Sequence, residues 1–138
     1  MKRVLHLCVV VAALTFLMPS AALAKDVCVS LFGGNGTLVF HKVKSLKKAG
    51  KTTPLHGVYF QFGAKASASG SATMGADGQV VFGVFVHAMV PGIANNITFS
   101  VIGAPDFTGT GEYDSDGDFL SDGDITWTPI DCKTVTIP

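Results

Sequence analysis

Short segments in which apolar and polar residues alternate recur from residue 27 to residue 137, and turn-forming residues separate them. The clearest segment is 64–73, where Ala or Gly occupies every second position and Lys, Ser or Thr occupies the positions between. A period of two is the pattern of a half-buried β-strand. No segment of residues 25–138 sustains the helical period of 3.6 residues. The chain is therefore expected to be all-β.

We expect eight or nine short strands, joined mostly by turns of hairpin length. Asn35-Gly36 and Asp77-Gly78 are dipeptides typical of tight turns. The expected strands cover residues 27–32, 37–44, 55–62, 64–73, 79–87, 96–102, 106–113, 124–130 and 132–137. Pro129 indicates a bulge or a sheet edge in the penultimate strand. Such a series predicts a single-domain antiparallel meander of about eight strands, either a closed barrel or a β-sandwich.

The first 24 residues have the composition of a secretory signal peptide. Lys2 and Arg3 form a basic start, residues 4–17 are almost wholly apolar, and Ala22-Leu23-Ala24 supplies the small residues that signal peptidase reads. The alternative is a retained membrane anchor, but the apolar run is shorter than the roughly 20 residues of a spanning helix. We expect residues 25–138 to form one secreted or periplasmic domain with no transmembrane segment.

Two cysteines, Cys28 and Cys132, remain in the mature chain. A cysteine pair in an exported protein predicts one disulfide. The alternatives are two free thiols or a redox pair, which normally lies closer in sequence, as in Cys-x-x-Cys. A disulfide would place the first and last strands side by side. It favours the barrel over the sandwich, because the end strands of an up-and-down barrel are neighbours.

The mature chain has eight lysines, no arginine and ten acidic residues, so its formal charge is −2. Recognition of nucleic acids relies on arginine and on a basic field, so no nucleic-acid partner is expected. Five of the lysines cluster in one segment: Lys42, Lys44, Lys47, Lys48 and Lys51. This cluster predicts a long exposed loop, and the alternative is attraction to an acidic surface or polymer.

Six of the ten acidic residues fall within residues 112–124. Acids at alternate positions followed by glycine supply the oxygen ligands that Ca²⁺ prefers. The run locally resembles the EF-hand loop, although Gly123 stands where the final bidentate glutamate belongs, and the Asp-rich repeats of thrombospondin type 3. The candidate calcium ligands are Glu112, Asp114, Asp116, Asp118 and Asp122. The alternative is a solvated turn built from Asp-Gly pairs.

The apolar side of segment 64–73 is made of small residues only. Its members are Ala64, Ala66, Ala68, Gly70 and Ala72. Small inward residues in a barrel strand leave volume for a small ligand, so these five are a candidate ligand cavity. The alternative is that they accommodate large neighbours such as Phe82 or Trp127.

The sequence contains no motif that assigns a catalytic activity. It has neither a Gly-x-Ser-x-Gly nucleophile elbow nor a phosphate-binding loop, and His41, His56 and His87 lack metal-ligand spacing. We therefore expect an exported β module with a binding or structural role, whose partner is a small ligand or a protein. Two alternatives remain open: a calcium-stabilised β module that uses loop 112–124, and a small hydrolase with an Asp/His site.

Overall fold

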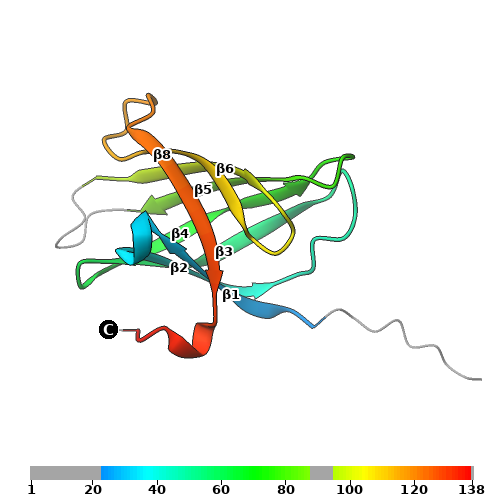
Figure 1. Ribbon diagram of the computed structural model, residues 1–138, viewed down its shortest axis with the longest axis horizontal. Coiled ribbons are helices and arrows are strands. Elements are labelled where there is room, and N and C mark those ends of the chain that lie inside the picture. Colours follow the sequence, from blue (N-terminus) through cyan, green and yellow to red (C-terminus); the bar gives the residue numbers. More distant parts are fainter. Residues whose placement is uncertain (1–22, 88–94, 138) are drawn as a thin grey trace, which may run out of the picture.

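The computed structural model describes residues 23–87 and 95–137 as eight antiparallel strands that close into a barrel (Figure 1). Each strand pairs with the next one along the chain, and β1 pairs with β8 to complete the ring. The strands are β1 (Lys25–Leu31), β2 (Gly36–Val43), β3 (Thr52–Gln61), β4 (Ala64–Met74), β5 (Val80–His87), β6 (Ile97–Gly103), β7 (Gly109–Asp114) and β8 (Gly123–Ile130). Two short 3₁₀ turns follow β1 and β8, η1 (Phe32–Gly34) and η2 (Cys132–Thr134). The expected meander and its closure into a barrel are confirmed.

Residues 1–22 of the predicted signal peptide lie outside the described residues. Cleavage after Ala24 stays a prediction, and β1 begins at the next residue, Lys25. In the part of the chain that the structure describes, no helix has the length and apolar character needed to cross a membrane.

Aromatic side chains fill the barrel interior. Trp127 lies among them, with its ring centroid 5.2 Å from that of Phe82 and 6.1 Å from that of Phe40. All three side chains are fully buried. Phe107 adds another ring, 4.8 Å from Phe82. Aromatic pairs at such separations contribute about 0.5–1.5 kcal/mol beyond the burial of their surface. The interior is therefore a packed core.

The small side of β4 faces this core, as the alternation predicts. Ala64, Ala66, Ala68 and Ala72 are buried, and Gly70 is half-buried. Ala72 is the cross-strand partner of Phe82. The hollows on the described part of the molecule are lined by other residues and by none of these five. In this structure the alanines make room for large neighbours, and a ligand cavity beside them stays a prediction.

A short seam between β1 and β8 closes the barrel. It has three paired positions, and one of them joins Val29 to Pro129. Pro129 therefore lies at a paired position of the last strand and not at a free edge. Cys132 follows β8 and forms a disulfide with Cys28, with the two Cα atoms 5.2 Å apart. The expected cysteine pair and the adjacency of the first and last strands are confirmed.

Three expected strand boundaries were wrong. β3 begins at Thr52 and not at residue 55. The other two errors involve aspartate side chains. Residues 132–137 do not form a ninth strand, because the Asp131 carboxylate accepts the backbone N–H of Lys133 at 3.0 Å and caps η2. β7 begins at Gly109 and not at residue 106, because the Asp106 carboxylate accepts the backbone N–H of Thr108 at 2.8 Å. In both places an aspartate side chain stabilises a turn that competes with strand pairing.

The connections between strands divide into two groups at opposite ends of the barrel. The β2–β3 loop (44–51), the β4–β5 turn (75–79) and the β6–β7 loop (104–108) share one end with the start of β1 (Figure 1). This end carries six of the eight lysines of residues 25–138, and we call it the lysine end: Lys25, Lys42, Lys44, Lys47, Lys48 and Lys51. The β7–β8 loop (115–122) lies at the other end, which we call the acidic end because residues 112–124 hold six of the ten acids.

Candidate functional site

A hollow of about 500 Å³ opens at the lysine end, between the start of β1, the β2–β3 and β6–β7 loops and the segment after β8. We call it the lysine-end hollow. Its apolar lining includes Val27, Val43, Leu46, Phe107, Pro129 and Ile130, and Leu23, from the predicted signal peptide, also lines it. The charged groups that line it are Lys25, Lys44, Lys47, Asp26, Asp106 and Asp131. An apolar lining with a few charged groups is typical of a binding site.

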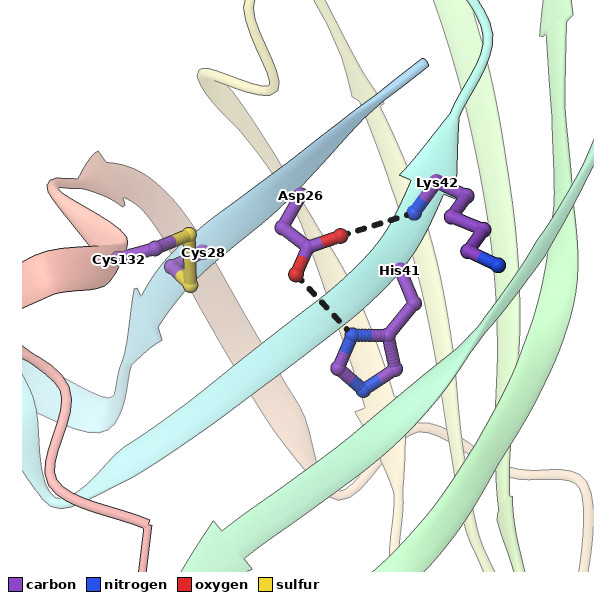
Figure 2. A network of polar contacts seen from close by, with 5 residues as sticks. All are labelled: Asp26, Cys28, His41, Lys42 and Cys132. Atoms are coloured by element: carbon purple, nitrogen blue, oxygen red, sulfur yellow. Dashed lines mark hydrogen bonds and ion pairs between the residues drawn. A yellow bond between two sulfur atoms is a disulfide. The ribbon is translucent and has the colours of Figure 1, made fainter.

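A β-bulge shapes the side of this hollow formed by β1 and β2. The pairing register of the two strands shifts at Asp26, which therefore faces both His41 and Lys42. Its carboxylate accepts the backbone N–H of Lys42 at 3.0 Å and contacts His41 Nδ1 at 3.3 Å (Figure 2). The Lys42 N–H, and then His41, lower the pKa of Asp26. Asp26 thereby holds Lys42 in a left-handed conformation with φ 52°.

The three carboxylates of the lysine-end hollow are all engaged by backbone N–H groups. Asp26 binds the bulge, Asp106 accepts the N–H of Thr108, and Asp131 accepts the N–H of Lys133. The Thr108 N–H lowers the pKa of Asp106. The lysines of the hollow, by contrast, make no ion pair within residues 23–87 and 95–137. Three lysines without ion pairs and three ionised carboxylates bound to backbone N–H groups therefore lie beside an apolar surface, and their formal charges sum to zero.

The β7–β8 loop is organised around Asp114, the last residue of β7. Its carboxylate accepts the backbone N–H groups of Asp116 at 3.1 Å, Gly117 at 2.8 Å and Phe119 at 2.9 Å. The Gly117 N–H is the main cause that lowers the pKa of Asp114, with further contributions from Phe119 and Asp116. Because Asp114 is only 8% exposed, it fixes the loop to the barrel.

Three of the five predicted calcium ligands come together in this loop. Asp114, Asp116 and Asp122 each offer a carboxylate oxygen, and these oxygens lie within 4.8 Å of one another. Glu112 and Asp118 are not in this group: Glu112 lies two residues before Asp114 on β7, and Asp118 accepts the backbone N–H of Leu120. The predicted ligand set is therefore brought together in part, as a group of three.

Repulsion between the carboxylates of the loop contributes to a raised pKa of Asp116. The backbone N–H of Asp118 lowers its pKa, but partial desolvation and the charges of Asp118, Asp122 and Asp114 outweigh this and raise the pKa overall. Asp122 has a compensating partner, because the backbone N–H and the hydroxyl of Ser115 both donate to it at 2.6 Å. A bound cation would relieve the repulsion that remains.

Two of the three histidines of residues 25–138, His41 and His87, form separate polar pairs. His41 contacts Asp26 between β2 and β1, and Ser69 Oγ lies 2.9 Å from His87 Nε2 between β4 and β5. As far as the chain is described, the first pair lacks a hydroxyl partner and the second lacks a carboxylate partner. The His41–Asp26 pair joins a histidine to a carboxylate of lowered pKa, and the alternative of a hydrolase with an Asp/His site stays a prediction.

Sequence reasoning placed Lys44 and Lys47 in an exposed loop but missed the hollow beside them. The one indication in the sequence is Leu46, a large apolar residue among lysines. In the structure Leu46 is only 7% exposed. Phe107 gave no indication of the hollow, because the sequence pattern predicts a strand over residues 106–113. No family model, curated protein or solved structure matches this chain.

Proposed function

We propose that the protein is an exported β-barrel module with a binding or structural role, and that the lysine-end hollow is its binding surface. The observation that carries this proposal is a hollow of about 500 Å³ that combines an apolar lining with lysines free of ion pairs among the described residues. The occupant that fits is an apolar group with negative charge beside it, on a small ligand or on a protein.

Export is supported by two features that are independent of the hollow. The predicted signal peptide ends one residue before β1 begins. The cysteine pair lies at disulfide geometry, and disulfides persist in oxidising compartments outside the cytosol. We therefore place the protein in the secreted or periplasmic fraction.

The binding proposal predicts that the mature protein binds 1-anilinonaphthalene-8-sulfonate, a probe with an apolar ring system and one negative charge. A Lys44→Glu/Lys47→Glu variant is expected to bind the probe about tenfold more weakly, because it removes two lysines and makes the charge beside the apolar lining strongly negative. A fluorescence titration at low ionic strength measures the dissociation constant.

Lys48→Glu/Lys51→Glu is the matched control. It makes the same charge change in the same loop, but neither residue lines the hollow. Probe binding that falls equally in both variants reports net charge only and contradicts the proposal, as does a complete lack of binding by the unmodified protein.

The group of Asp114, Asp116 and Asp122 supports a second candidate function, a calcium-stabilised module. Three carboxylate oxygens within 4.8 Å of one another match the oxygen ligands of Ca²⁺. If the folded state alone binds calcium, the ion raises its stability by mass action. The role of the ion would be to stiffen the β7–β8 loop.

This candidate predicts a rise in Tm on the order of 10 °C, relative to chelator, when calcium is about a hundredfold above its dissociation constant. Asp116→Asn is expected to abolish the rise, since it removes one charged ligand from an exposed position. Asp77→Asn is the control, because Asp77 also belongs to an Asp-Gly turn but has no such acidic group around it. Equal melting curves with calcium and with chelator would contradict calcium binding. The loop would then be a turn stabilised by its own hydrogen bonds to Asp114.

A further inference from the structure

A second hollow, of about 300 Å³, opens at the acidic end of the barrel, between η1, the β3–β4 turn and the start of the β7–β8 loop (Figure 1). We call it the aromatic hollow. Phe32, Phe62 and Tyr113 line it with aromatic rings, and Asn35 and Gln61 line it with amide groups. Within the described part of the chain, no charged residue lines it. The mouth of a β-barrel is a common place for a ligand site, and the lining of this one is uncharged.

The rings of the aromatic hollow differ in how far they are covered. Phe32 packs edge to face against Tyr113, with ring centroids 5.0 Å apart and ring planes at 87°. Gly36 leaves room for this arrangement, since a Cβ there would lie 3.2 Å from the Phe32 ring. Phe62 is 79% exposed and has no ring contact with another described residue. The hollow therefore has a fixed aromatic floor and one aromatic ring that is open to a ligand.

A buried tyrosine sets the orientation of the Gln61 amide. The Tyr59 hydroxyl donates to Gln61 Oε1 at 2.7 Å, and Tyr59 is fully buried. Burial raises the pKa of Tyr59, so its hydroxyl stays protonated and remains the donor. The amide oxygen of Gln61 is thereby occupied, and its NH₂ group has no acceptor among the described residues. Gln61 is therefore a preset hydrogen-bond donor on the wall of the hollow.

This lining favours a neutral ligand with oxygen acceptors and an apolar face. Transfer of an ion into an uncharged hollow is unfavourable, because no group replaces its hydration. The NH₂ group of Gln61 needs an acceptor, which a cation lacks, and the carboxylates of the neighbouring β7–β8 loop repel an anion. A sugar ring has hydroxyl acceptors at its edge and C–H groups on its face, and C–H groups are attracted to the negative face of an aromatic ring.

We propose that the aromatic hollow binds a small neutral saccharide, which packs its C–H face against Phe62 and accepts a hydrogen bond from the Gln61 amide. A volume of about 300 Å³ is at the lower limit for ligand pockets, so the ligand is a small sugar or the end of a longer one. The site lies at the opposite end of the barrel from the lysine-end hollow, and it does not depend on the proposed function of that hollow.

An NMR titration of the oxidised protein without its predicted signal peptide tests the inference. The probes are maltose, cellobiose, lactose and N,N′-diacetylchitobiose, each up to about 50 mM, and we expect at least one to bind with a dissociation constant on the order of 1 mM. Its binding is expected to shift the side-chain NH₂ signals of Gln61 and Asn35. The signals of Leu46 and Phe107, which lie at the lysine end, are expected to stay unchanged.

Two variants each remove one feature of the site. Phe62→Ala removes an exposed ring, so the fold is preserved and affinity is expected to fall about tenfold. Gln61→Glu keeps an oxygen for the Tyr59 hydroxyl but replaces the NH₂ donors, and a similar loss of about tenfold is expected. Phe119→Ala is the matched control, because Phe119 is 92% exposed at the same end of the barrel but does not line the aromatic hollow. This control is expected to bind like the unmodified protein.

Three results would overturn the inference. They are a lack of binding by all four sugars, shifts that map outside the aromatic hollow, and equal losses of affinity in Phe62→Ala and Phe119→Ala. Benzyl alcohol is an uncharged aromatic probe, and its binding in the absence of any sugar binding would assign the hollow to aromatic ligands instead. The sulfonate probe reports on the lysine-end hollow alone, so either site can fail while the other stands.

Discussion

A Cys28→Ala/Cys132→Ala variant is expected to lose on the order of 4 kcal/mol of unfolding free energy. The bond closes a loop with a sequence separation of 104, and a cross-link of this span removes about 4.7 kcal/mol of chain entropy from the unfolded state, less any strain. The β1–β8 seam that the bond supports has only three paired positions. Urea unfolding of the oxidised protein and of the variant measures the difference.

The unmodified protein in reductant is the natural control for this experiment. Residues 25–138 contain no other cysteine, so the reduced protein is expected to unfold at the same urea concentration as the variant. A variant that stays within about 1 kcal/mol of the oxidised protein would show that the seam holds without the bond.

Gly57→Ala is expected to destabilise the barrel by about 3 kcal/mol. A Cβ at Gly57 would overlap the carbonyl oxygen of Val39 on β2 and would lie 2.9 Å from the Cα of Phe40. Both obstacles are backbone atoms of a paired strand, so the barrel itself must shift to admit one methyl group. The measurement is again the free energy of unfolding in urea.

Gly83→Ala adds the same methyl group at a position where no atom obstructs it. Gly83 lies in β5, and nothing approaches its Cβ position within 4 Å. Because glycine is unfavourable in a strand interior, this variant is expected to be neutral or more stable by about 0.5–1 kcal/mol. Equal destabilisation by the two substitutions would mean that the close approach at Gly57 does not control stability.

Much of the fold is predictable from the sequence because it depends on local patterns. The alternation at residues 64–73 predicts which side of β4 is buried, and the Cys28–Cys132 pair predicts that the ends of the meander meet. The errors at residues 106–108 and 132–137 have one cause. Asp106 and Asp131 cap turns through their side chains, and the alternation of apolar residues carries no record of such capping.

The candidate sites are predictable only in part, because they depend on contacts between distant segments. The lysine-end hollow joins β1, two loops and the segment after β8, so no single stretch of sequence describes it. The acidic loop was recognisable from its composition, but the strained backbone at Phe119 was not. Left-handed conformations usually belong to glycine or asparagine, and here Asp114 imposes one on a bulky residue.

Because the barrel closes through β1 and β8, the first strand of the chain can complete its pairing only when the last strand is available. If the chain crosses a membrane from its amino end, β1 emerges first and waits with one open edge until the seven other strands have formed behind it. An unpaired strand edge is a template for aggregation, so this interval is the hazardous stage of biogenesis. The bond between Cys28 and Cys132 cannot form before residue 132 has also crossed the membrane. Residues 25–138 contain no third cysteine, so the bond once formed ties the first strand to the segment after the last one.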